Sequence, residues 1–300
     1  MADRRLQVFH AVAKYLSFTR AADALFMTQP AVTFQIKQIE EEFNTRLFER
    51  RHGSISLTPA GDLVLSYAEK ILALSDEMET RISEMTGEMR GILQLGASTT
   101  IAEHLLPKAL GEFNALYPLV RVQLTVANSE SIESQVSEHR LNVGLIESPA
   151  KTIGLSSEVC CSDEMWVICA SNHPLAERDT VTPKLLADYE YISREPGSGT
   201  REVIEAYFRQ NKIAADKLKI QMELGSTESL KGVVATGLGF AIVSRAVVEK
   251  EIQLGILAAI PLNPPLQRNL YLTYPKDRFQ SKLTTTFSKF AKRKLKEVVL

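Results

Sequence analysis

The chain has 300 residues, of which 45% are hydrophobic and 24% charged, enough for a small domain and a larger one that each bury a sizeable core. The formal net charge is only −1, which excludes indiscriminate binding of nucleic acid through overall charge. No apolar run reaches about twenty residues and the N-terminus lacks a signal-peptide core, so we expect a cytoplasmic protein without a membrane partner.

Residues 17–42 have the pattern of two short helices joined by a tight turn. Thr19 is expected to cap the first helix and Thr28 the second, whose first turn holds Pro30. One face of the second helix is apolar, with Val32, Ile36, Ile39 and Phe43 at helical spacing. Its other face can hydrogen-bond, stack or pair with phosphate through Gln29, Thr33, Phe34, Gln35 and Lys37. This surface suits a DNA major groove, and an ordinary helical hairpin is the alternative.

The flanking segments complete a winged helix-turn-helix. An amphipathic helix precedes the pair, with Leu6, Phe9, Val12 and Ala13 on its apolar face. Residues 46–58 then read as two short strands around a turn at Gly53. The tip of this wing carries Arg50, Arg51 and His52, which suit phosphate or minor-groove contact; in an irregular loop they would be only solvated charge.

Several linked motifs in this region occur in a fixed order. They are SFTRAA at 17–22, TQPAV at 28–32, Ile36 and Glu40, LFER at 47–50, and LTPAG at 57–61. With these motifs, residues 1–90 resemble the N-terminal part of LysR-type transcriptional regulators. The resemblance implies a DNA-binding head on residues 1–58, and the predicted DNA contacts are Thr28, Gln29, Pro30, Thr33, Phe34, Gln35, Lys37, Arg50, Arg51 and His52.

One position departs from the family pattern. The family often has Ser-Arg where this chain has Thr33-Phe34. Phe34 can replace a charged contact by apolar packing against a thymine methyl group or a sugar. The base preference of relatives therefore cannot be copied to this chain.

Residues 59–90 form a predicted linker helix without an internal breaker. Apolar residues recur every three or four positions, with one stutter in a seven-residue repeat: Val64, Tyr67, Ile71, Leu74, Met78, Ile82, Met85 and Met89. The resemblance implies a dimerising helix, hence a homodimer, and a homotetramer if dimers pair; the alternative is packing on the chain's own C-terminal domain. A two-fold dimer would present two recognition helices to an inverted repeat. Gly87 and Gly91 mark the expected hinge.

Residues 91–300 alternate between strand and helix. Strands are predicted at 92–97, 120–126, 143–146, 165–170, 189–193, 220–224, 240–244 and 269–274, and helices at 101–117, 129–138, 183–187, 200–210 and 227–235. This order predicts parallel strands with helices on both faces. We expect two lobes, one of residues 91–162 and 268–300 and one of 163–267, joined by crossovers near 161–164 and 266–270. By the resemblance this is an effector-binding domain similar to periplasmic binding proteins, which makes the whole chain an α+β / α/β protein.

Three strand-to-helix junctions begin with hydroxyl side chains, at 98–100, at 197–200 and at 226–227. Helix N-termini carry partial positive charge, so several of them at one cleft would bind a small anion; for each residue taken singly, capping alone is the alternative. Arg194 and Arg201 could add donors, and Glu147 could accept from a ligand hydroxyl, orient an arginine or pair with a neighbour. The predicted effector contacts are Ser98, Thr99, Thr100, Glu147, Arg194, Gly199, Thr200, Arg201, Ser226 and Thr227.

The run 194–201 also resembles one found in family members that regulate sulfur and carbon assimilation. We therefore expect a sulfur oxyanion, a phosphate-bearing metabolite or a carboxylate as effector. No catalytic, metal or cofactor motif occurs, because the five histidines are dispersed and the glycine run at 197–199 lacks the further residues of a P-loop or dinucleotide fingerprint. Cys160, Cys161 and Cys169 are read as reduced thiols, with a redox switch as the alternative.

The sequence thus predicts an effector-controlled transcriptional regulator that binds promoter DNA and acts on RNA polymerase, and not an enzyme. The competing class is a cytoplasmic small-molecule binding or catalytic α/β protein whose helical head serves only in assembly.

Overall fold

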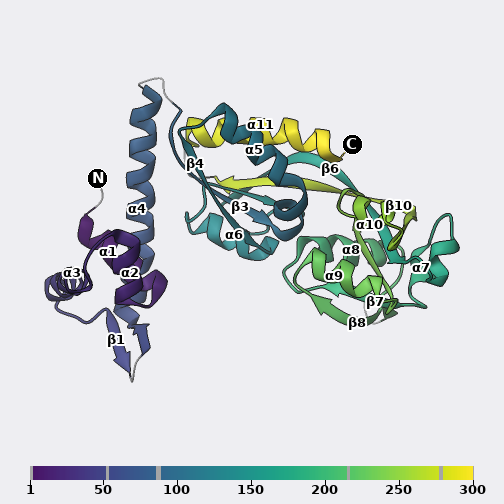
Figure 1. Ribbon diagram of the computed structural model, residues 1–300, viewed down its shortest axis with the longest axis horizontal. Coiled ribbons are helices and arrows are strands. Elements are labelled where there is room, and N and C mark those ends of the chain that lie inside the picture. The colour runs from purple at the N-terminus through teal and green to yellow at the C-terminus, as the bar shows by residue number, and fades with distance from the viewer. Residues whose placement is uncertain (1–2, 52–53, 86–88, 215–216, 277–279, 300) are drawn as a thin grey trace. The chain divides into compact units, whose positions relative to one another are not determined.

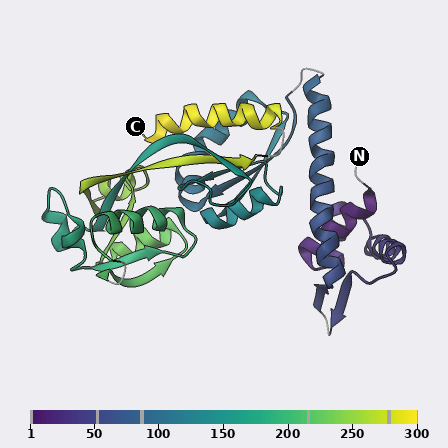
Figure 2. The same ribbon diagram turned by 180° about the vertical axis from the view of Figure 1, so that it is seen from behind.

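The computed structural model describes residues 3–51, 54–85, 89–214, 217–276 and 280–299 (Figures 1 and 2). The chain forms two compact units, Met1–Gly91 and Ile92–Leu300, and each is described by itself. None of the helices in the described residues is long and apolar enough to cross a membrane.

The first unit contains a cluster of short helices, a two-stranded wing and one long helix. In chain order they are α1 (Arg4–Tyr15), α2 (Phe18–Leu25), α3 (Gln29–Glu42), β1 (Phe48–Arg51), β2 (Ser54–Leu57) and α4 (Pro59–Met85). The two strands are antiparallel, with Phe48 opposite Leu57 and Arg51 opposite Ser54. The expected winged helix-turn-helix is confirmed.

The helix starts are fixed by side-chain caps. Ser17 caps α2, because its Oγ accepts a hydrogen bond from the backbone N–H of Arg20 at 3.2 Å. The prediction that Thr19 caps this helix was wrong by two residues, because α2 already begins at Phe18. Thr28 caps α3 as expected, with its Oγ1 3.4 Å from the N–H of Ala31. Caps of this kind satisfy backbone donors that the first helical turn leaves free.

The wing is joined to the helices through the Glu40 side chain and a close backbone approach at Gly61. The Oε1 atom of Glu40, on α3, accepts hydrogen bonds from the N–H groups of Leu47 at 2.8 Å and Phe48 at 3.3 Å. At the start of α4, a Cβ on Gly61 would lie 2.1 Å from the carbonyl oxygen of Leu47. Glycine at this position therefore lets the long helix approach the wing.

Helix α4 has one buried and one exposed apolar face. Ala68 is fully buried in the core of the first unit and Val64 packs against that core. The sequence had suggested that Val64 belongs to the outer stripe. In the structure it does not, and Leu63 occupies that position. The exposed positions, here called the α4 stripe, are 46–61% accessible: Leu63, Tyr67, Ile71, Leu74, Met78 and Ile82. The helix ends at Met85, before Met89, and the hinge residue Gly87 lies outside the described residues.

The second unit is built on a curled mixed sheet. Within the described residues its eight strands lie in the order β4-β3-β5-β10-β6-β9-β7-β8. Their bounds are β3 Gly91–Ser98, β4 Val120–Ala127, β5 Val143–Ile146, β6 Leu155–Ala170, β7 Glu190–Arg194, β8 Lys219–Leu224, β9 Phe240–Ser244 and β10 Leu257–Pro275. Strands β4, β3 and β5 form the first lobe, and β9, β7 and β8 form the second.

Strands β6 and β10 are antiparallel to each other and run from one lobe to the other, so the prediction of parallel strands does not hold for this pair. Strand β3 is parallel to β5, and β7 is parallel to β8, as the alternating pattern required. The two expected crossovers lie inside the long strands, where Cys161 pairs with Leu270 and Glu164 with Gln267. The sequence analysis had detected only the C-terminal part of each strand, residues 165–170 and 269–274.

Helices cover both faces of the sheet. They are α5 (Leu106–Leu116), α6 (Ser129–Ser137), α7 (Pro183–Leu186), α8 (Gly199–Gln210), α9 (Thr227–Ala235), α10 (Glu249–Gln253) and α11 (Lys282–Val299). In the second lobe α8 buries Ile204 and Phe208 in one core cluster and α9 buries Leu230 and Val234 in another. The helix predicted at 101–117 begins with a π-helical turn, Ile101–Leu105.

Candidate nucleic-acid interface and effector site

The outer face of α3 is free within the first unit. Thr28, Gln29, Pro30 and Lys37 are exposed, and Phe34 is 58% accessible although it is apolar. Thr33 and Gln35 are half-buried. The Nε2 atom of Gln29 donates to the Oγ1 atom of Thr33 at 2.8 Å, which holds the amide along the helix. The residues predicted to read DNA thus form one polar surface around an exposed aromatic ring.

The wing carries the other residues that were predicted to contact DNA. Arg50 and Arg51 lie on β1, opposite Ile55 and Ser54, and His52 lies outside the described residues. The turn between α2 and α3 adds a residue that the sequence did not single out. Phe26 is 98% accessible and has a left-handed backbone, with φ of 53°. Its motif position before Met27 gave no hint of this exposure.

In the second unit, strand ends and helix starts meet where the two lobes join. Strands β3 and β4 of the first lobe and β7 and β8 of the second are each followed within five residues by a helix start, at Ile101, α6, α8 and α9, and β5 ends directly before Glu147. The carboxyl ends of strands in α/β sheets are the usual place for ligands. Most of the predicted effector residues fall into two clusters here, one at the start of α9 and one at the starts of α6 and α8.

The first cluster surrounds the N-terminus of α9. The Oγ1 atoms of Thr100, in the first lobe, and Thr227, in the second, lie 3.2 Å apart. The Nη1 atom of Arg194 is 3.5 Å from Thr227 Oγ1, while its other donors are engaged by Glu195 at 2.8 and 3.1 Å. Ser98 is 2% accessible, and its buried Oγ has no hydrogen-bond partner among the described residues. Most buried hydroxyls in proteins are hydrogen-bonded, which makes this position unusual.

The second cluster surrounds the N-termini of α6 and α8. The Glu147 carboxylate accepts hydrogen bonds from Ser129 Oγ at 2.8 Å and from Thr200 Oγ1 at 3.4 Å. The Nη1 atom of Arg268 donates to Thr200 Oγ1 at 2.7 Å. Gly199 is buried between these groups. Glu147 therefore contacts hydroxyls of its own chain, one from each lobe.

An ion pair that the sequence analysis missed supports this cluster. Asp163 and Arg268 face each other on β6 and β10, with Nη2 and Oδ2 2.7 Å apart and both side chains 1% accessible. Ser244 Oγ donates to the second carboxylate oxygen at 2.7 Å. The available signal was one acidic and one basic residue, each inside a segment predicted as a crossover between lobes.

Two predicted effector residues are held by partners in their own lobe. Arg201 is held by acidic partners on its own lobe, Glu205 at 2.7 Å and Glu223, and it donates to the carbonyl of Arg194. Ser226 acts as the cap of α9, accepting from the N–H of Ser229 at 3.3 Å. Thr99 is buried beside Ser98.

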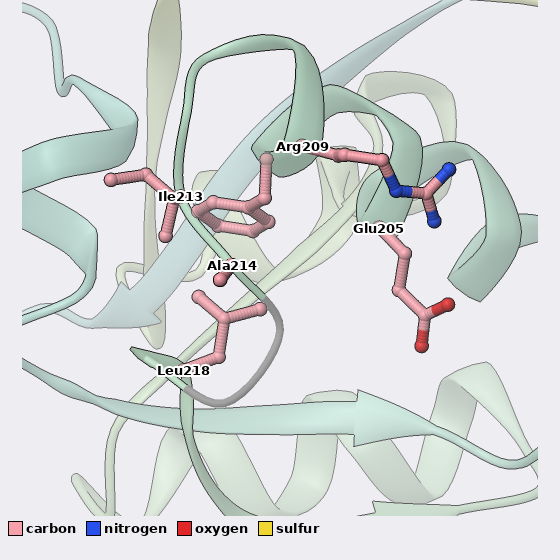
Figure 3. A pocket seen from close by; sticks show the side chains of 6 residues that line it. Glu205, Arg209, Ile213, Ala214 and Leu218 are labelled. Atoms are coloured by element: carbon pink, nitrogen blue, oxygen red, sulfur yellow. The ribbon is translucent and has the colours of Figure 1, made fainter.

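A pocket of about 240 Å³ lies elsewhere in the second lobe (Figure 3). Its lining comes from the C-terminal half of α8 and the residues after it: Glu205, Phe208, Arg209, Ile213, Ala214 and Leu218. The predicted effector residues Gly199 and Thr200 are at the opposite end of the same helix. The pocket is therefore separate from the lobe junction.

Metal and thiol chemistry find little support in the described part of the chain. No group of three His, Cys, Asp or Glu side chains there comes close enough to hold a metal ion. The three cysteines are free and buried. Burial raises the pKa of Cys169 to about 11, which keeps that thiol protonated at neutral pH.

A group of ionisable side chains flanks the first cluster. His104, on the π-helical turn of the first lobe, has its Nε2 atom 3.3 Å from Glu228 Oε1 on α9. The buried Lys231 ammonium lies 2.7 Å from Glu228 and 2.8 Å from Glu251. Burial, reinforced by Lys231, lowers the pKa of His104, and Lys250 acts in the same direction while Glu228 and Glu251 oppose it. Burial also raises the pKa of Glu103, next to His104.

Comparison with known families agrees with both units. The model of the "Bacterial regulatory helix-turn-helix protein, lysR family" matches residues 4–62, and that of the "LysR substrate binding domain" matches residues 86–296. The chain belongs to the LysR family. It is therefore a DNA-binding transcriptional regulator with an effector-binding domain, and the assembly-only head considered above is set aside.

Individual relatives align with two thirds or more of this chain. A probable RuBisCO transcriptional regulator of Nostoc sp. is 35% identical over 288 residues, which are 95% of this chain and 86% of the relative. The regulatory domain of Synechocystis CcmR, solved in complex with 2-PG, is 28% identical, with a TM-score of 0.61 over 69% of this chain and 97% of that one. Full-length CbnR, solved with its target DNA, shares the fold at 21% identity, with a TM-score of 0.71 over 98% of this chain and all of that one.

We expect the stability of this LysR-family protein to fall as the pH falls below about 6.5, in part because of His104. Its pKa is lowered in the folded state, so below the unfolded-state value of 6.5 the unfolded chain binds more protons. The variant His104→Gln lacks this effect. The stability of the wild type relative to the variant, measured by urea unfolding, should decrease between pH 7.5 and 5.5; parallel pH curves would contradict the assignment.

Proposed function

We propose that a small anionic effector binds at the lobe junction, against the N-terminus of α9, and thereby changes how the dimer holds promoter DNA. The observation that carries the proposal is the first cluster. It combines a hydroxyl pair from the two lobes, Thr100 and Thr227, with the unpartnered buried Ser98 Oγ and one donor of Arg194. Helix N-termini and hydroxyl donors favour oxyanions.

The chemistry of the site also limits the class of effector. Sulfur oxyanions, phosphate-bearing metabolites and carboxylates all present oxygen acceptors to such a site. A phosphate-bearing compound is favoured, since CcmR, the 28%-identical relative, was solved with 2-PG. An effector that contacts both lobes stabilises their closed arrangement, and RNA polymerase would sense the result through the altered DNA complex.

The α4 stripe supports a homodimer. Six large apolar side chains lie 46–61% exposed at spacings of three and four residues, which is the pattern of a helix that packs against a second helix. A second copy of the chain supplies the same stripe, so a two-fold pair buries both. The dimer would carry two copies of α3, one for each half-site of an inverted repeat.

The dimer is tested by placing a charge in the α4 stripe. Leu74→Glu should shift the protein to a smaller mass in analytical ultracentrifugation, because a buried charge in an apolar seam is costly. Ser66→Glu is the control, since Ser66 is also exposed on α4 but lies off the stripe. If the Leu74→Glu variant remained a dimer, the α4 stripe would not be the dimer interface.

DNA recognition is tested by comparing Gln29→Ala with Lys37→Ala. Gln29 can read a base edge, so its loss should weaken specific binding by roughly 1–3 kcal/mol and leave random DNA nearly unaffected. Lys37 is an exposed charge, so its loss, like that of Arg50, should weaken all sequences and reduce the salt slope by about 1. Binding is measured by fluorescence anisotropy at several salt concentrations. Equal losses on specific and random DNA for Gln29→Ala would remove its base-reading role.

Effector binding is tested by thermal shift and calorimetry with phosphate, sulfate, sulfite, 2-phosphoglycolate, 2-phosphoglycerate and small carboxylates. A compound that binds the native state raises its melting temperature. Thr227→Val should weaken binding of the active compound roughly tenfold, the value of one lost hydrogen bond to a charged group. Thr236→Val is the control, because Thr236 is exposed at the other end of α9.

The regulatory step is then tested on the promoter of a target gene. The extent of the DNase footprint or the DNA bend should change when the active compound is added. An identical footprint and bend with and without a compound that binds would contradict the proposed control of DNA binding.

A further inference from the structure

Glu147 is a buried carboxylate that bonds to both lobes. It follows β5 in the first lobe and is 2% accessible. Its Oε2 atom accepts from Ser129, in the first lobe, at 2.8 Å, and its Oε1 atom accepts from Thr200, in the second lobe, at 3.4 Å. In the described residues it has no ion-pair partner within 4 Å, so hydroxyl groups and helix ends provide its surroundings.

The first residues of two helices lie against this carboxylate. Ser129 is the first residue of α6, and Gly199 and Thr200 are the first residues of α8. A Cβ on Gly199 would lie 2.6 Å from Ser129 Oγ and 3.1 Å from Glu147 Oε2, so the start of α8 closes directly over the carboxylate. The positive ends of two helices favour a negative group between them.

The Thr200 hydroxyl is oriented toward Glu147 by the missed ion pair. Arg268 donates to Thr200 Oγ1 at 2.7 Å, and Asp163 fixes Arg268 through its Nε atom at 2.8 Å. Because that hydroxyl accepts from the guanidinium, its own proton is available for Glu147 Oε1. The Thr200 hydroxyl thus links the Asp163–Arg268 ion pair to the Glu147 carboxylate.

Further contacts join the lobes around this point. Asn128 Nδ2 donates to the carbonyl of Pro196 at 3.3 Å, and the N–H of Glu130 donates to the carbonyl of Gly197 at 3.2 Å. Both contacts connect the start of α6 with the loop before α8. Glu147 is the buried anion among these contacts between the two lobes.

We infer that Glu147 is a resident anionic ligand: its carboxylate occupies the oxyanion position formed by α6 and α8 and holds the two lobes together there. An effector anion is then excluded from this position and has to use the N-terminus of α9. This last consequence rests on the proposed function, whereas the role of Glu147 does not. Glu147 is therefore a specificity-determining residue, since it rejects a second negative group directed at α8.

The test is chemical rescue in the full-length protein without effector. Glu147→Ala should lower the melting temperature and leave room for a small carboxylate. Sodium formate or acetate at 200 mM should then raise the melting temperature of this variant by roughly 2–4 °C more than that of the wild type, relative to sodium chloride at equal ionic strength. Glu147→Gln fills the same space and should gain no more from formate than the wild type does.

The outcomes separate the inference from the proposed function. A Glu147→Ala variant that responds to formate no more than the wild type overturns the resident-anion role, even if the wild type binds phosphate at α9. Rescue by formate with no anion binding by the wild type supports the role of Glu147 and overturns the effector site instead.

A double-mutant cycle provides a second test if Glu147→Ala does not fold. Glu147→Gln and Thr200→Val each weaken the contact between the lobes while keeping side-chain volume. Losses in the double variant that are smaller than the sum of the single losses support a direct interlobe bond, measured by urea unfolding. Strictly additive losses overturn it.

Discussion

The antiparallel pairing of β6 with β10 is the constraint on which the second unit depends. These strands pair from Leu155 opposite Pro275 to Ala170 opposite Leu257, with register shifts between Pro261 and Leu266 and between Leu270 and Tyr271, and their ladder passes through both lobes. The ion pair of Asp163 and Arg268 lies within this ladder, fully buried. Removing either partner of such a pair leaves an uncompensated buried charge, which costs about 3–5 kcal/mol. Because both lobes are built onto this ladder, it determines which helix starts meet at the lobe junction.

Much of the first unit could be predicted from the sequence because its signals are local. The spacing of Val32, Ile36 and Ile39 defines the buried side of α3, and the position of Pro30 defines its start. The error at Thr19 arose because two hydroxyl residues, Ser17 and Thr19, could each cap α2. The assignment of Val64 to the outer stripe failed because α4 has apolar residues on two faces, and sequence spacing does not tell which face the core occupies.

The geometry of the proposed effector site was harder to predict because it depends on contacts between distant segments. Hydroxyl residues at helix starts were found, yet the pairing of Thr100 with Thr227 spans 127 positions of the chain. Arg201 was assigned to the ligand by its residue type, and the sequence did not indicate its ion pairs with Glu205 and Glu223 on its own lobe. Asp163 and Arg268 escaped attention because a charged residue inside a strand is normally solvent-facing.

The paired long strands also determine how the second lobe is connected to the rest of the protein. Met165 and Leu266, where the chain enters and leaves that lobe, are partners across the ladder. The second lobe is therefore an insertion whose two ends emerge side by side. An insertion of this type can change in length or be exchanged as a single block without altering any other connection, so the part of the domain that contributes α8 and α9 can diverge while the surrounding framework is retained.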